Sequence, residues 1–219
     1  GVEIEFMEML EMVQLVPKAD PAETQKLYQH IIKNWHFTKP ADEQVLLTGI
    51  RYYLALKKMI EKKGYEAVSL IDVDGMKRLL NYPPSLIFML LANEMKLCTI
   101  PENDAHGSVT QLIAKHLTGQ NAMYLEFYEF MKDRVLMGVP DYVPQDFTEG
   151  PYTITPTNFG LLGESMLNVS RLKTGTVTIA RLYKSRAGYG IHLAVAQATA
   201  PRSWEEAGWA PPAPQLPSL

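Results

Sequence analysis

Two short apolar runs, each followed by acidic residues, alternate with helical patterns between residues 65 and 119, and this order constrains the fold most. The first run, YEAVSLIDVDG, is apolar until its two aspartates, and the second, LCTIP, leads directly to Glu102. Such runs are typical of buried parallel strands, whereas residues 85–95 and 105–118 repeat apolar side chains at helical spacing. The order predicts an α/β fold: a parallel-sheet βαβ domain with helices on both faces. In such sheets, ligands bind beyond the carboxyl ends of the strands.

Two helices with recognisable ends are predicted before this segment. Asp20 followed by Pro21 resembles a helix cap with proline at the first helical position, so a helix is expected to run to about Asn34. Residues 40–63 repeat apolar side chains at helical spacing, and Gly64 follows as a left-handed stop.

The pattern changes after about residue 147, where alternating polar and apolar residues replace the helical period. We therefore expect an α/β domain over residues 1–147 and a smaller antiparallel β-rich region over residues 148–219. Residues 2–6 also alternate and are expected to form a strand. The proline-rich residues 201–219 are expected to form an extended connector, which suggests that the sequence is part of a longer protein.

Composition excludes several classes of partner. The formal net charge of −3, without a long Lys/Arg cluster, argues against nucleic acid binding. No apolar run reaches the roughly 20 residues of a membrane helix, and no signal peptide pattern opens the chain. The single cysteine, Cys98, cannot form an internal disulfide. We therefore expect a cytoplasmic protein without membrane or nucleic acid partners.

Two glutamates occupy positions from which a sheet could present them to one ligand. Glu102 follows the second apolar run, and in AMYLEFYEF the residues Tyr124, Glu126 and Tyr128 alternate with apolar ones. A register slip of one residue would select Glu129 instead. Carboxylates from separate elements are suitable ligands for Mn²⁺ or Mg²⁺. Mutual repulsion raises the pKa of neighbouring carboxyl groups, and a raised pKa makes them suitable for proton transfer. The simpler alternative is that each glutamate is an ordinary surface acid.

Four further polar residues are expected near these acids. Asp72 is either a hydrogen-bond acceptor for the substrate or for a metal ligand, or an ordinary turn residue. The turn between the second apolar run and the next expected helix carries Glu102, and we call it the elbow. Asn103 and Asp104 are expected to orient this elbow and to cap the next helix. His106 is expected to hydrogen-bond to the substrate or to a metal-bound carboxylate.

The run ENDAHGSVTQLIAKHLTG, followed by Glu126 on the next expected strand, resembles a segment of the L-fucose isomerases. That segment reads END, then a nearby glycine, a helix ending in LTG and an aspartate on the next strand. L-arabinose isomerases look like more distant relatives. The resemblance implies that Glu102 and Glu126 are catalytic residues and ligands of Mn²⁺ or another divalent cation. It also implies an aldose–ketose isomerase that acts through an enediol, binds a small sugar and forms a homo-oligomer.

The resemblance covers the second domain of these isomerases and part of their C-terminal domain. It implies that the N-terminal domain and the histidine that completes the metal site lie outside this chain, which is then expected to have little or no activity alone. Two alternatives remain: a non-catalytic sugar-binding or regulatory homologue of the same fold, and a module that serves mainly as an assembly interface.

Overall fold

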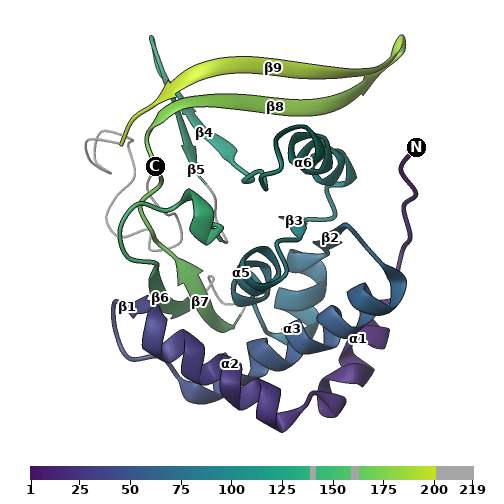
Figure 1. Cartoon of the computed structure of the whole chain (residues 1–219), viewed down its shortest axis with the longest axis vertical. Coiled ribbons are helices and arrows are strands. Elements are labelled where there is room, and N and C mark those ends of the chain that lie inside the picture. The colour runs from purple at the N-terminus through teal and green to yellow at the C-terminus, as the bar shows by residue number, and fades with distance from the viewer. Residues whose placement is uncertain (139–141, 159–162, 201–219) are drawn as a thin grey trace.

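The computed structural model describes residues 1–138, 142–158 and 163–200, and Figure 1 shows a helical end opposite a long β-hairpin. The longer helices are α1 (Met9–Leu15), α2 (Pro21–Asn34), α3 (Glu43–Lys63), α5 (Ser85–Glu94) and α6 (Ala105–Thr118). Short helical segments are η1 (Val16–Lys18), the π-helix η2 (Asp72–Lys77), α4 (Arg78–Leu80) and η3 (Gln145–Phe147). The strands are β1 (His36–Phe37), β2 (Ala67–Leu70), β3 (Cys98–Pro101), β4 (Glu126–Phe130), β5 (Val135–Gly138), β6 (Thr153–Asn158), β7 (Glu164–Asn168), β8 (Gly175–Ser185) and β9 (Gly188–Ala198).

The predicted helix ends are largely confirmed. The Asp20 side chain accepts a hydrogen bond from the N–H of Ala22 at the start of α2. Helix α3 starts later than the proline pattern predicted, because Asp42 supplies the cap and accepts two backbone N–H groups. Gly64 ends α3 with a φ of +73°, in the left-handed region that glycine tolerates best.

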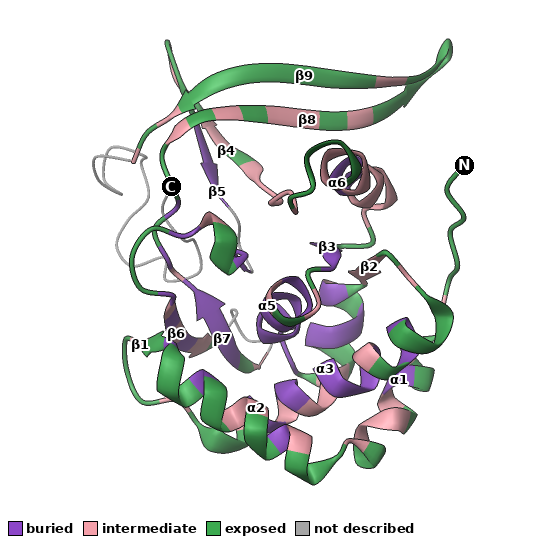
Figure 2. Cartoon of the chain, in the orientation of Figure 1, coloured by how far each residue is buried: buried purple, intermediate pink, exposed green. Residues whose placement is uncertain are grey.

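The core is centred on α5, which contacts α3, β3 and β7. The side chains from Leu86 to Leu91 are 0% exposed, so this helix is apolar all round. Figure 2 shows that buried residues gather around α3, α5 and β7, whereas the residues along β9 are mostly exposed.

Strands β2 and β3 form the predicted parallel pair, in register from Ala67 opposite Cys98 to Leu70 opposite Pro101. Helix α6 contacts both strands, and α5 contacts β3. Figure 1 shows these helices on opposite sides of the pair. The mixed α/β character and a parallel pair between helices are therefore confirmed.

The AMYLEFYEF segment contains a strand, as expected, but this strand does not extend the parallel pair of β2 and β3. The strand, β4, pairs antiparallel with β5. The two strands are joined by a tight turn in which the Met131 N–H donates to the Arg134 carbonyl at 2.9 Å. A connection this short permits only antiparallel pairing, since a parallel pair needs a crossover of a dozen or more residues.

The antiparallel β-rich region is present as the pairs β6–β7 and β8–β9. Strand β1 lies before residue 147 in the sequence and pairs parallel with β6, which lies after it. The sheet that contains β6 therefore includes a strand from each side of the expected boundary. The boundary at residue 147 stays a prediction. The strand expected over residues 2–6 is wrong, because no strand forms there and Phe6 is 89% exposed. The predicted connector over residues 201–219 lies outside the described residues.

None of the helices in the described part of the chain combines the length and apolar character needed to cross a membrane.

Candidate functional site

Strand β3 ends in an elbow formed by Glu102 and Asn103, both in the left-handed backbone region. Their φ angles are +64° and +54°, and this conformation costs most L-residues about 1–2 kcal/mol, although asparagine adopts it more readily than glutamate. The Asn103 N–H donates to the Leu70 carbonyl at 3.2 Å, which ties the elbow to β2. Backbone strain of this kind clusters at functional sites, where the direction of a side chain matters more than stability.

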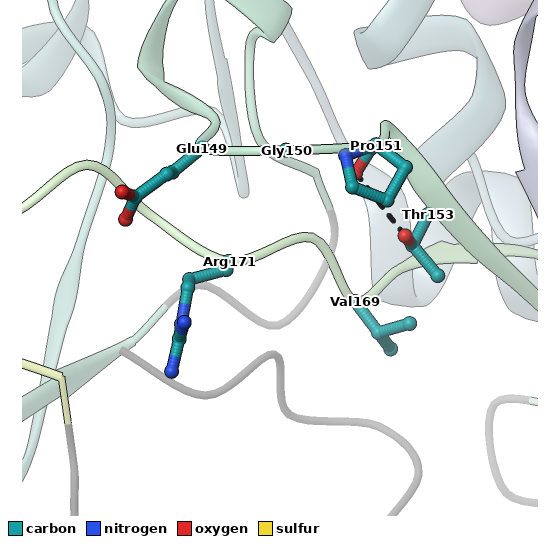
Figure 3. Close-up of a pocket in the computed structure, with 6 residues that line it drawn as sticks. All are labelled: Glu149, Gly150, Pro151, Thr153, Val169 and Arg171. Atoms are coloured by element: carbon teal, nitrogen blue, oxygen red, sulfur yellow. Dashed lines mark hydrogen bonds between the residues drawn. The ribbon is translucent and has the colours of Figure 1, made fainter.

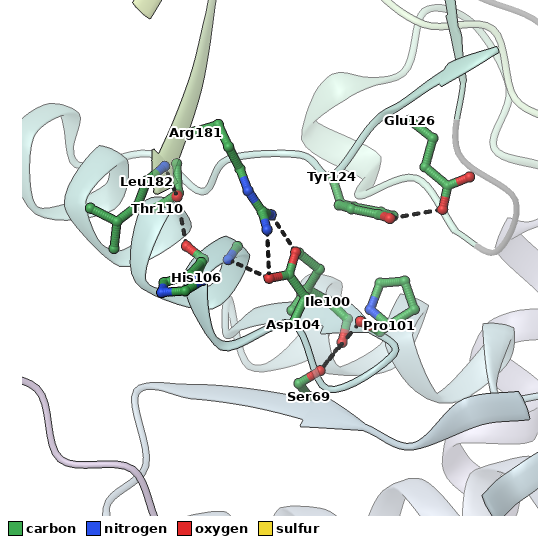
Figure 4. Close-up of polar contacts among 11 residues, drawn as sticks. Ser69, Ile100, Pro101, Asp104, His106, Thr110, Tyr124, Glu126, Arg181 and Leu182 are labelled. Carbon is green, nitrogen blue, oxygen red and sulfur yellow. Dashed lines mark hydrogen bonds and ion pairs between the residues drawn. The ribbon is translucent and has the colours of Figure 1, made fainter. Parts of the chain in front are cut away.

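Asp104 caps α6, as predicted, and also binds a side chain from β8. Its Oδ1 accepts the Gly107 N–H at 2.9 Å, and Arg181 donates to both carboxylate oxygens (Figure 4). Burial works against ionisation of Asp104, but the hydrogen bonds from Arg181 and Gly107 outweigh it and hold the pKa of Asp104 below its usual value. Asp104 is therefore a carboxylate whose charge is already compensated.

Glu102 lies within electrostatic reach of three other acids, Asp72, Glu126 and Asp104. Partial burial raises the pKa of Glu102, although the residue as a whole is exposed, and the charges of Asp72 and Glu126 raise it further. Lys77 acts in the opposite direction. The acid of β4 that acts on Glu102 is thus Glu126, which the alternation selects, rather than Glu129.

Tyr124, just before β4, fixes the position of Glu126. Its hydroxyl donates to Oε1 of Glu126 at 2.7 Å. Burial and this hydrogen bond raise the pKa of Tyr124, so the phenol keeps its proton and remains a donor. Figure 4 shows the Tyr124–Glu126 pair beside the elbow that carries Asp104.

Asp72 forms a buried ion pair with Lys77 at 2.7 Å, and both side chains are 2% exposed. Both residues belong to η2, where the five-residue spacing of a π-helix brings them together; π-helical turns occur frequently at functional sites. The negative charge of Asp72 is therefore compensated by the ammonium group of Lys77. Within the part of the chain that the structure describes, no ion pair is found for Glu102 or Glu126.

His106 lies in the first turn of α6 and faces β9. Its ring packs edge-on against that of Tyr189, with 6.2 Å between the centroids. Its carbonyl accepts the Thr110 hydroxyl at 2.7 Å, and Thr110 in turn accepts the Leu182 N–H at 2.9 Å. These contacts attach α6 to the β8–β9 hairpin. A hydrogen bond from the His106 ring to a substrate or metal ligand stays a prediction.

Glu102 and Glu126 carry the carboxylate oxygens that Mn²⁺ and Mg²⁺ prefer as ligands, and a bound cation would offset their like charges. Across residues 1–138, 142–158 and 163–200, no set of three His, Cys, Asp or Glu side chains is arranged to hold a metal ion. Coordination of a metal ion by Glu102 and Glu126 therefore stays a prediction.

A separate surface pocket of about 420 Å³ lies between the segments before β6 and after β7 (Figure 3). Its walls include Glu149, Pro151 and Arg171, which are exposed. No residue expected at the site lines this pocket, and its open polar walls differ from the enclosed, largely apolar pockets that bind small ligands.

Sequence reasoning missed two charged residues near the acids, Lys77 and Arg181. Lys77 follows Asp72 by five residues, a spacing that pairs side chains in a π-helix but carries little weight in a sequence expected to form a strand and a turn. Arg181 comes from a distant hairpin, and nothing in the local pattern identifies it.

No model of a protein family matches the chain, and no curated protein matches it. The similarity to L-fucose isomerases therefore rests on the motif that begins at Glu102 and on the position of Glu126.

Proposed function

We propose that this chain carries the acidic part of the active site of a metal-dependent aldose–ketose isomerase, with Mn²⁺ as the preferred ion. The observation that carries the proposal is that Glu126, from β4, acts electrostatically on Glu102, from the elbow after β3. The resemblance to L-fucose isomerases supplies the reaction class. A cytoplasmic setting, a small sugar as substrate and a homo-oligomeric state belong to the same proposal.

Glu102 has properties that suit a group that moves a proton. Its raised pKa means that it holds a proton at a higher pH than an ordinary glutamate, which brings it closer to the range in which acid–base catalysis is efficient. The strained elbow fixes the direction of its backbone, because Asn103 is hydrogen-bonded to β2.

Glu126 is held by a donor that stays protonated. The Tyr124 hydroxyl occupies Oε1, so the carboxylate has a fixed orientation when a sugar approaches. A bound divalent cation would supply polarisation of the sugar carbonyl and of the neighbouring hydroxyl.

The reaction transfers a proton between adjacent carbons. One carboxylate takes the proton from C2 of the aldose, the released electron pair forms the C1–C2 double bond, and O1 gains a proton to give the enediol. C1 then receives a proton while O2 loses one, which gives the ketose. Glu102 and Glu126 are the two groups proposed to exchange these protons, and either can act first.

The test is exchange of carbon-bound hydrogen in heavy water. The full chain is incubated with Mn²⁺ and a panel of aldohexoses and aldopentoses, and deuterium at C1 of the ketose and at C2 of the aldose is followed by NMR. This readout detects proton abstraction even when net conversion is slow. We expect Glu102→Gln and Glu126→Gln each to reduce exchange by about 10²-fold or more. Glu129→Gln, on the same strand, is the matched control and should retain the wild-type rate.

Exchange above background in the wild type that is equally fast in the Glu102→Gln/Glu126→Gln double variant, with unchanged circular dichroism, would refute the proposed roles. Calorimetric binding of a sugar that is independent of Mn²⁺, without any exchange, would instead favour the non-catalytic sugar-binding homologue.

A further inference from the structure

The elbow after β3 is held from two sides. On one side, the Asn103 N–H donates to the Leu70 carbonyl, which fixes the elbow to β2. On the other side, the two left-handed residues lead directly into Asp104, whose carboxylate is bound to the start of α6. A strained backbone persists where the surrounding structure holds it, since the strain would otherwise relax. The contacts of Asp104 therefore decide how firmly the elbow keeps its shape.

Asp104 is held more firmly than a helix cap requires. Asp20 and Asp42 also cap helices with their carboxylates, and both have extended backbones, with ψ angles of 121° and 124°. Neither forms an ion pair within the described part of the chain. Asp104 has a ψ of 87° and accepts hydrogen bonds from Arg181 on both carboxylate oxygens. Capping alone therefore explains neither the backbone of Asp104 nor its arginine partner.

The contact between Arg181 and Asp104 has the geometry of a strong ion pair. Two guanidinium nitrogens donate to two carboxylate oxygens, with 2.9 Å between Nη2 and Oδ1. Paired hydrogen bonds of this kind fix orientation as well as distance. The Asp104 side chain is 21% exposed, so water screens this pair less than a fully exposed one. A Cβ atom at Gly107 would lie 2.5 Å from Oδ2, so the carboxylate also packs directly onto the backbone of α6.

The arginine belongs to a hairpin that docks on the half of α6 next to the elbow. Strand β8 contacts α6, and Figure 1 shows the β8–β9 hairpin lying along this helix. The Leu182 N–H donates to the Thr110 hydroxyl, and Tyr189 packs against His106. Figure 4 shows Arg181 extending from the same strand to the start of α6. A two-stranded hairpin is marginally stable in water unless other elements support it, so these contacts are what keeps it docked.

We propose that Arg181 is a positioning residue for Glu102: the docked β8–β9 hairpin clamps Asp104 through Arg181 and so holds the elbow in its left-handed shape. Release of the hairpin removes one of the two restraints on the elbow, and the strained backbone then relaxes. The hairpin is therefore a regulatory element of the acidic site. The consequence for catalysis rests on the proposed function, whereas the consequence for the backbone does not.

The test is NMR on the full chain without sugar or metal. The α-carbon chemical shifts of Glu102 and Asn103 report their backbone conformation, and hydrogen exchange of the Asn103 N–H reports its bond to β2. In Arg181→Gln, both shifts should move away from their left-handed values, and the Asn103 N–H should exchange about tenfold faster or more. Arg181→Lys keeps the charge but loses the paired geometry, so it should fall between Arg181→Gln and wild type.

Arg186→Gln is the matched control, because Arg186 is exposed in the turn of the same hairpin and its substitution removes the same charge. It should leave the elbow unchanged. The amides of α5 report on the whole fold and should exchange at the wild-type rate in every variant. An elbow that is the same in Arg181→Gln as in Arg186→Gln would overturn the proposal. Equal acceleration of α5 and the elbow would also overturn it, since Arg181 would then act on overall stability.

Deuterium exchange into sugar in the presence of Mn²⁺ tests the consequence for catalysis. Arg181→Gln should lower the rate at saturating sugar about tenfold or more, because Glu102 is no longer held in place. The KM should change by less than about twofold, and a raised KM with an unchanged rate would contradict a positioning role. A wild-type chain without exchange would refute the isomerase proposal, and the NMR comparison, which needs neither sugar nor metal, would still decide whether Arg181 clamps the elbow.

Discussion

Helix α5 and the elbow after β3 are close in sequence but differ in almost every physical respect. The side chains from Leu86 to Leu91 are fully buried, and their packing stabilises the fold. Glu102 and Asn103 are exposed, both have left-handed backbones, and Glu102 lies near like charges. The comparison teaches that stability and the proposed chemistry come from different regions. Substitutions in the helix should therefore destabilise the protein, whereas suitable substitutions at the elbow should stabilise it.

The largest expected effect is in the helix. Phe88 is 0% exposed and its ring centroid lies 5.4 Å from that of Tyr142. Phe88→Ala should lower the free energy of unfolding by about 3–5 kcal/mol, because it removes buried apolar area and leaves a cavity. Urea denaturation measures this loss. Leu79→Ala, at a side chain 73% exposed, is the control and should change stability by less than about 0.5 kcal/mol. Similar losses at both positions would contradict the assignment of α5 to the core.

A smaller effect of opposite sign is expected at Asn103. Glycine adopts the left-handed region without a Cβ penalty, so Asn103→Gly should raise the free energy of unfolding by about 0.5–1 kcal/mol, after the larger entropy of the unfolded chain is included. Asn103→Ala keeps the Cβ atom and should be less stable than Asn103→Gly. Urea denaturation of the three proteins gives the order. A glycine variant less stable than the alanine variant would show that the elbow is not strained.

The smallest expected effect is the pH dependence contributed by Glu102. Folding raises the pKa of this carboxyl, so the folded protein holds the proton more tightly than the unfolded chain. The resulting stabilisation is fully present below the unfolded value near 4.5 and is lost as pH rises through the higher folded value. Glu102→Gln should therefore be more stable than wild type at neutral pH by a few tenths of a kcal/mol, since Glu102 is exposed. Denaturation from acid to neutral pH measures the difference, and an advantage that grows in acid would contradict the sign.

Local signals predicted the parts of the fold that depend on neighbouring residues. The cap at Asp20, the stop at Gly64 and strand β3 all follow from side chains within a few positions of each other. The elbow after β3 was predicted for the same reason. Asp104 caps α6 through a residue three positions later.

Contacts between distant segments could not be predicted from these patterns. Alternation in β4 fits a parallel or an antiparallel strand equally well, so the pairing with β5 was missed. Arg181 reaches Asp104 across 77 positions, and its neighbours look like those of any exposed hairpin residue. The left-handed φ of Glu102 was also not expected, because glutamate has no preference for that region.

The most direct test of the central claim is whether Glu102 and Glu126 share one cation. Binding of Mn²⁺ to the full chain, followed by electron paramagnetic resonance, should weaken about tenfold or more in each single glutamine variant. The double variant should lose much less than the product of the two single effects, because either substitution alone already disrupts the shared site. Mn²⁺ affinity equal to wild type in both single variants, or fully independent effects, would show that the two acids do not share an ion.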